Sequence, residues 1–108
     1  MIRKLTVVST ITLFVLSATI AFAAEPGPAE IFKGKCASCH GPDGAGATAI
    51  GKALKVRDLR SADVQKASDA DLQKVISDGK GKMPAYKTKL SVADISSLVA
   101  YIRGLAKK

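Results

Sequence analysis

Apolar residues recur at helical spacing in three stretches of the chain. In the first, Ile31, Phe32, Cys36 and Cys39 share one face at the three- and four-residue spacing of a helix. A proline near the start suits the first helical turn. We therefore predict a helix from about Pro28 to Cys39, with both thiols on one stripe.

The second stretch lies in the middle of the chain. Ser68 is a suitable N-cap, with an acidic residue three positions later, and Gly79 ends the pattern. The apolar positions between them are Leu72, Val75 and Ile76. This pattern predicts a helix over about Asp69–Asp78. Residues 61–66 predict a single capped turn, and residues 47–60, which show no period, predict a loop.

The third stretch forms the C-terminal part of the chain. Ser91 and Asp94 have the spacing of a capping box. A wide apolar stripe follows, formed by Val92, Ile95, Leu98, Val99, Ile102 and Leu105. The three stretches together predict an all-α fold with three main helices joined by glycine-rich and proline-rich loops.

The first residues predict a leader rather than part of this fold. Arg3 and Lys4 precede an apolar stretch, and Ala21-Phe22-Ala23 has the form of a cleavage site. We expect a secretory signal peptide over residues 1–23, cleavage after Ala23, and one domain over residues 24–108. The expected location is the periplasm. An uncleaved membrane anchor that leaves the domain facing the periplasm is the alternative.

The pentapeptide Cys36-Ala37-Ser38-Cys39-His40 carries the clearest chemistry. It reads C-x-x-C-H, the attachment signature of a c-type haem. The two thiols would add to the vinyl groups of one porphyrin edge, and His40 would bind the iron. The alternatives are a thioredoxin-like redox pair, half of a zinc site, or a disulfide. One covalently attached haem c is the favoured cofactor.

A second iron ligand is predicted by elimination. The chain has one histidine, His40, so two histidine ligands within one subunit are impossible. Met83 is the only methionine outside the leader, and it lies in a Gly/Pro loop rather than on a helical stripe. We predict Met83 as the second axial ligand, with an open site or a lysine ligand as alternatives.

Composition excludes other classes of ligand. The segment 46–53 reads G-x-x-x-x-G-K but continues with Ala53, lacks the hydroxyl that would hold Mg²⁺, and follows no predicted strand, so we expect no nucleotide. The formal net charge is +8, but the charge has no interleaved aromatic residues, so we expect no nucleic acid. The domain has one Phe, two Tyr and no Trp, and a bound porphyrin would supply the missing apolar bulk.

The haem motif through Gly41, the Lys82-Met83-Pro84 loop and a C-terminal helix with Tyr101 resemble a small bacterial class I c-type cytochrome with one haem. The similarity is to the cytochrome c6 and c551 types. It implies the class I cytochrome c fold, with loops wrapped around one covalently attached haem. It also implies that the first and last helices cross, with Phe32 and Tyr101 packed at the crossing.

The expected function is that of a soluble periplasmic one-electron carrier. If both axial positions are filled, no substrate reaches the iron, and we nominate no catalytic residue. The alternatives are a haem-bearing subunit docked in a larger redox complex, or a haem peroxidase. We expect a monomer that meets redox proteins and contacts a membrane only through such a partner. Lysines could steer acidic partners to the haem edge, namely Lys33, Lys35, Lys52, Lys55, Lys80, Lys82, Lys87 and Lys89.

Overall fold

The computed structural model describes residues 15–20 and 25–106. Its helices are α1 (Pro28–Lys35), α2 (Ala37–His40), α3 (Ala49–Leu54), α4 (Ala62–Gln65), α5 (Asp69–Asp78) and α6 (Val92–Leu105). The described residues form no named strand, and their only β pairing is an isolated bridge. The predicted all-α fold is therefore confirmed.

The predicted leader lies mostly outside the described residues, and so does the cleavage site expected after Ala23. Residues 15–20 have no regular secondary structure, and their large apolar side chains are exposed. In the described part of the chain, no helix is both long and apolar enough to cross a membrane.

Two predicted elements match the structure closely. Helix α5 has the predicted bounds, and the Ser68 side chain accepts a hydrogen bond from the Asp71 N–H at its start. Helix α6 begins with the predicted capping box, in which Ser91 and Asp94 bond to each other's backbone N–H. These caps satisfy amides that the first turn leaves without partners, which fixes where each helix begins.

The prediction of one helix over Pro28–Cys39 is wrong in one respect. The helix breaks at Cys36, whose φ of −115° and ψ of −35° separate α1 from α2. The loop expected over residues 47–60 also contains α3. A cap at Thr48 starts this short helix, and Lys55 ends it in the left-handed conformation, with φ of 54°. Apolar periodicity misses a helix this short because it covers fewer than two turns.

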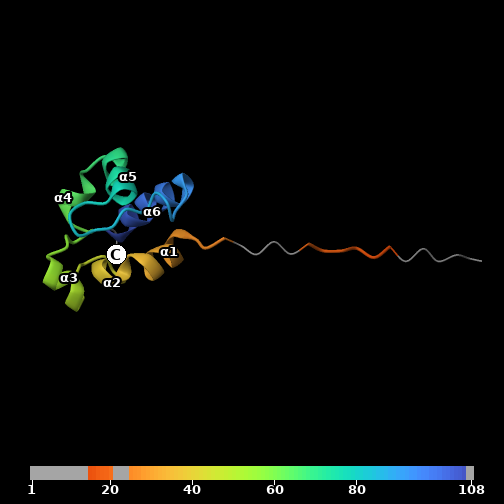
Figure 1. The fold of residues 1–108 in the computed structure, drawn as a ribbon, viewed down its shortest axis with the longest axis horizontal. Helices are drawn as coiled ribbons and strands as arrows, with labels where there is room; N and C mark the ends of the chain where they lie inside the picture. Colours follow the sequence, from red (N-terminus) through yellow and green to blue (C-terminus); the bar gives the residue numbers. More distant parts are fainter. Residues whose placement is uncertain (1–14, 21–24, 107–108) are drawn as a thin grey trace, which may run out of the picture.

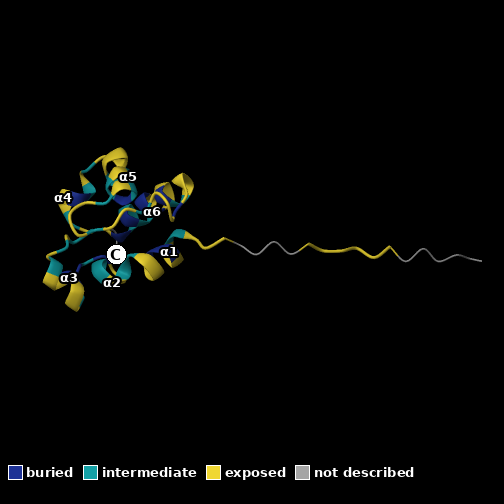
Figure 2. Cartoon of the chain, in the orientation of Figure 1, coloured by how far each residue is buried: buried dark blue, intermediate teal, exposed yellow. Residues whose placement is uncertain are grey.

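Helix α6 lies at the centre of the core. It packs against α1 and α5, while α2 packs against α1 and α3. Figure 1 shows α1, α2 and α3 along one side of the molecule and α4 and α5 on the other. Figure 2 shows buried residues on the faces that these helices turn toward one another. The expected packing of the first helix on the last is confirmed, since the ring centroids of Phe32 and Tyr101 lie 5.0 Å apart, with their planes inclined by 44°.

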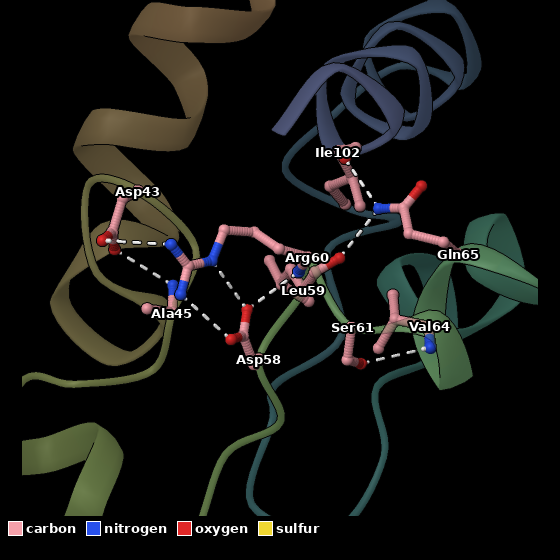
Figure 3. Close-up of polar contacts among 9 residues, drawn as sticks. All are labelled: Asp43, Ala45, Asp58, Leu59, Arg60, Ser61, Val64, Gln65 and Ile102. Atoms are coloured by element: carbon pink, nitrogen blue, oxygen red, sulfur yellow. Dashed lines mark hydrogen bonds and ion pairs between the residues drawn. The ribbon is translucent and has the colours of Figure 1, made fainter. Parts of the chain in front are cut away.

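Polar contacts fix the segment between α3 and α4. Gln65 Nε2 donates to the carbonyls of Leu59 at 2.8 Å and Ile102 at 3.0 Å, which joins this segment to α6 (Figure 3). Arg60 binds the Asp58 carboxylate through two nitrogens, at 3.0 and 3.1 Å, and extends toward Asp43. Directional bonds of this kind give an irregular segment a defined path beside the core.

A guanidinium group joins the end of α6 to the turn between α4 and α5. Arg103 donates to the carbonyls of Gln65 and Ala67, both at 2.6 Å. It also forms an ion pair with Asp69 at 2.7 Å. The planar fork of arginine suits several acceptors at once, so a single side chain positions this turn.

Candidate functional site

All four residues predicted to bind the cofactor line the same cavity. Its volume is about 760 Å³, within the range of sites that hold a bound organic group. Cys36, Cys39 and His40 reach it from the α1–α2 side, and Met83 reaches it from the loop after α5. All four are half-buried. The fold thus brings together residues far apart in sequence.

The rest of the cavity wall is largely apolar. Its large apolar side chains are Phe32, Leu54, Val56, Leu59, Val64, Leu72, Val75, Ile76, Leu90, Leu98 and Ile102. Phe32 and Leu98 are also the most deeply buried large side chains of the core. The cavity is therefore an extension of the core, and an apolar ring would continue the packing of the helices.

Helix α3 holds the C-x-x-C-H motif in place. The Thr48 hydroxyl donates to the carbonyls of Ser38 at 2.9 Å and Cys39 at 3.2 Å. The same oxygen accepts from the Gly51 N–H at 2.9 Å. A Cβ on Gly51 would collide with the Cys39 carbonyl oxygen, so only glycine permits this approach. The segment that resembles a phosphate-binding loop instead supports α2.

The two cysteines are free thiols in a protected setting. They are not joined in a disulfide. Burial raises the pKa of the Cys36 thiol, and the nearby Lys35 ammonium only partly offsets this. A thiol that stays protonated at neutral pH is a poor redox nucleophile. The thioredoxin-like alternative is therefore disfavoured at Cys36.

His40 has a buried ring nitrogen, Nδ1, that makes no hydrogen bond of normal geometry to any group within residues 15–20 and 25–106. Burial lowers the pKa of His40, and the nearby Arg57 backbone acts in the opposite direction. The imidazole is therefore neutral near pH 7, which is the form that binds a metal ion.

A tight loop positions Met83. Lys80 and Met83 pair through two backbone hydrogen bonds, at 3.1 Å from the Lys80 N–H and 3.0 Å from the Met83 N–H. Gly81 and Gly79 both have positive φ, 57° and 76°. A Cβ on Gly79 would lie 2.6 Å from the Met83 carbonyl oxygen, whereas one on Gly81 would meet no atom within 4 Å. Gly79 therefore allows the loop to close back on itself.

Tyr86 is a cavity residue that the sequence did not single out. Its hydroxyl donates to the Lys35 carbonyl at 3.0 Å, although the two residues lie 51 positions apart. Burial raises the pKa of Tyr86, and the nearby Cys36 and Cys39 act in the same direction. The phenol therefore stays protonated and donates throughout the neutral range. Thr48, Gly51 and Gly79 were likewise missed as supports of the site.

The lining of the cavity carries more basic than acidic groups. Its basic residues are Lys35, Lys55, Arg57, Lys74, Lys80 and Lys82, and its acidic residues are Asp63 and Asp71. The predicted lysines Lys33, Lys52, Lys87 and Lys89 lie elsewhere, and Lys87 faces the Asp78 carboxylate at 3.8 Å. Only part of the lysine set predicted to steer partners therefore lines the cavity. Lys74 and Arg57 line it as well, although the sequence did not single them out.

Other metal or redox sites are not favoured by this geometry. Within residues 15–20 and 25–106, no three His, Cys, Asp or Glu side chains are grouped to hold a metal ion. A second cavity of about 410 Å³ is lined by Pro42, Asp43, Arg60 and Leu105, none of them a predicted ligand.

Comparisons with known proteins identify the family of the chain. Residues 23–102 match the family model described as cytochrome c oxidase, cbb3-type, subunit III. The chain is 35% identical to cytochrome c6 of Picosynechococcus sp. over 109 residues, which cover 95% of this chain and 90% of that protein. It is also 35% identical to the cbb3-type cytochrome c oxidase subunit CcoP of Azospirillum brasilense, of which the match covers 30%.

A solved structure extends the similarity to the fold. The c-type cytochrome KustC0563 superposes with a TM-score of 0.69 at 30% sequence identity, over 74% of this chain and 98% of that one. The chain therefore belongs to the family of small class I c-type cytochromes. Membership implies a covalently attached haem c, as the sequence predicts, and makes the chain an electron carrier rather than an enzyme.

The residues present fit that cofactor. Two free thiols, a neutral imidazole with an unsatisfied buried nitrogen and a thioether line one largely apolar cavity. These are the donor groups that covalent haem attachment and iron ligation use.

Substitution of the two loop glycines tests how tightly the backbone at each position is constrained. We expect Gly81→Ala to cost about 1–2 kcal/mol of stability, because alanine disfavours positive φ. We expect a larger loss for Gly79→Ala, because its φ of 76° and ψ of 171° are essentially restricted to glycine and because the added Cβ also forces the Met83–Ala85 backbone to move. Urea unfolding of both variants measures the difference. Equal losses would show that Gly79 is not needed for close approach.

Proposed function

We propose that Cys36 and Cys39 form the two thioether links to haem c, and that His40 and Met83 bind its iron from the two sides of the ring. The protein would then be an exported one-electron carrier. The observation that carries this proposal is the common cavity, because it gathers all four side chains onto one apolar site.

Each residue has a defined task in this proposal. The helical turn of α2 and the break at Cys36 present the two thiols to one edge of the porphyrin. His40 supplies a neutral imidazole held by the α2–α3 contact. Met83 supplies a soft thioether, which stabilises the reduced state and raises the potential. When bound, haem c supplies a one-electron couple.

A closed coordination sphere determines what the site does. With His40 and Met83 both ligated, no iron position remains for substrate. The apolar part of the wall would favour the less charged reduced state of a bound haem. Electrons would then enter and leave through whatever part of the ring edge reaches the surface, and no acid, base or nucleophile is required.

The leader predicted over residues 1–23 supports export, and the periplasm is the proposed location. Attachment of haem to a C-x-x-C-H motif takes place outside the cytoplasm in bacteria, which agrees with this route. A monomer that moves between redox partners is the simplest form of such a carrier.

A docked subunit is the second candidate. It is favoured by the match to the oxidase subunit III family model and by the similarity to CcoP. The match covers 30% of CcoP, so the rest of that subunit lies outside the matched region. The two roles differ in native size, because a free carrier migrates as one small domain and a docked subunit migrates with its complex.

Removal of the thiols tests covalent attachment. We expect Cys36→Ser and Cys39→Ser to keep at most one thioether link and to accumulate poorly, because attachment supplies part of the core. The double variant should carry no covalent haem. Mass spectrometry of the denatured protein reports the links, and Ser38→Ala, an exposed change within the motif, is the matched control. A double variant that still holds haem covalently would refute the assignment.

Removal of the thioether tests the second ligand. We expect Met83→Ala to fold but to lose the far-red band that arises from sulfur-to-iron charge transfer. Axial ligands span about 0.8 V among haem proteins, so a potential drop on the order of 0.3 V is expected. At ~59 mV per decade this equals roughly 7 kcal/mol. The reduced variant should also bind carbon monoxide.

The control for this substitution is Lys82→Gln, which alters the same loop without removing sulfur. The Lys82→Gln variant should keep the far-red charge-transfer band, and its reduced form should not bind carbon monoxide. If Met83→Ala also keeps both the band and the potential, another group is the ligand.

The basic lining predicts steering of acidic redox partners. Lys74 lies at the cavity, whereas Lys33 is an exposed lysine that does not line it. We expect Lys74→Gln to slow electron transfer with an acidic partner by roughly two- to threefold at low salt, and Lys33→Gln to change it less. Stopped-flow rates at several ionic strengths provide the measurement. A rate that does not fall with added salt would contradict steering.

A further inference from the structure

The break between α1 and α2 leaves a backbone carbonyl without a helical partner. Helix α1 ends at Lys35, and the Cys39 N–H bonds to the Cys36 carbonyl at 3.3 Å rather than to Lys35. The last carbonyls of a helix need partners from outside it. The Tyr86 hydroxyl fills this role at Lys35, directly beside the attachment motif.

Tyr86 itself is firmly anchored at the end of the Met83 loop. Its N–H lies 3.0 Å from the Ile76 carbonyl and 3.2 Å from that of Ser77, which fixes it to the end of α5. Its carbonyl accepts from the N–H groups of Lys89 and Leu90, both at 2.9 Å. The side chain therefore projects from a rigid backbone position and reaches across to α1.

The Met83 loop is thus held at both ends by different means. At its start, Lys80 and Met83 pair through their backbones, and Gly79 leaves room for the Met83 carbonyl oxygen. At its end, Tyr86 ties the loop to the helix that carries the thiols. Met83 lies between the two, and Met83, Tyr86 and Cys36 all line the same cavity.

We propose that the Tyr86–Lys35 hydrogen bond is a latch that keeps the Met83 loop closed over the cavity. Tyr86 is then a positioning residue, which acts on the iron only through Met83. It sets how often the loop opens and therefore how fast Met83 leaves the iron. This inference rests on the proposed ligation by Met83.

The latch is local to the loop, which distinguishes it from general packing. It joins Lys35 and Tyr86, which both line the cavity, whereas Tyr101, the ring packed on Phe32, does not. The bond is exposed, so its loss should not leave a buried polar group unsatisfied. Tyr86→Phe keeps the ring and its packing and removes only the hydroxyl.

Two measurements on the haem-loaded protein test the latch. The first is the limiting rate at which saturating imidazole displaces Met83 from the oxidised iron. The second is hydrogen exchange of the Lys80 and Met83 amides in the reduced protein. We expect Tyr86→Phe to raise both by roughly two- to tenfold, the factor that corresponds to one ordinary hydrogen bond.

The matched control is Tyr101→Phe. Tyr101 has no side-chain hydrogen bond among the described residues and lies outside the cavity lining, so neither measurement should change. A second control adds Tyr86→Phe to Met83→Ala. Imidazole binding should then be insensitive to the latch, because no ligand remains to be displaced.

The outcomes separate the latch from the ligand assignment. If Tyr86→Phe changes neither measurement, the latch is refuted while Met83 remains the ligand. If amide exchange rises but imidazole binding does not, Met83 does not close the site and the proposed ligation fails with the inference. If exchange rises equally in α6, Tyr86 is a general structural support and the latch is wrong.

Discussion

The fold depends on an apolar cavity that its helices surround rather than fill. Phe32 and Leu98, the most buried large side chains, face both the helix core and this cavity. A domain of this size with so few aromatic residues has little other apolar surface to bury. The covalent cofactor of this family therefore belongs to the core as much as to the function. The side chains of α1, α5 and α6 that line the cavity also belong to the core that holds these helices together.

Local chemistry in the sequence accounts for the elements that were predicted well. Ser68 and Ser91 cap their own helices, and the apolar stripes of α5 and α6 repeat over enough turns to be recognised. The C-x-x-C-H motif is equally local, because the spacing itself carries the chemistry. Met83 could be singled out because the domain has no other methionine and no second histidine, and because Met83 lies in a Gly/Pro loop.

The features that escaped prediction depend on contacts distant in sequence. The break at Cys36 accompanies a bond from Tyr86 to the Lys35 carbonyl, 51 residues away, and α3 depends on the hydrogen bonds of Thr48 to the α2 carbonyls. The distribution of lysines is a similar case. Lys74 faces the cavity, whereas Lys52 does not, and only the folded path of the chain distinguishes them. Periodicity describes one element at a time and contains no information on such pairs.

The packing of α1 against α6 constrains when the protein can fold during its synthesis. Helices α1 and α6 are partners, so the core has no complete wall until α6 is present. Helices as short as α1 and α5 are marginal in water without such a partner. A nascent chain that lacks α6 thus has nothing stable to fold onto. Its thiols would stay accessible until α6 is present, so the proposed haem attachment and the closure of the core would be coupled to the completion of that helix.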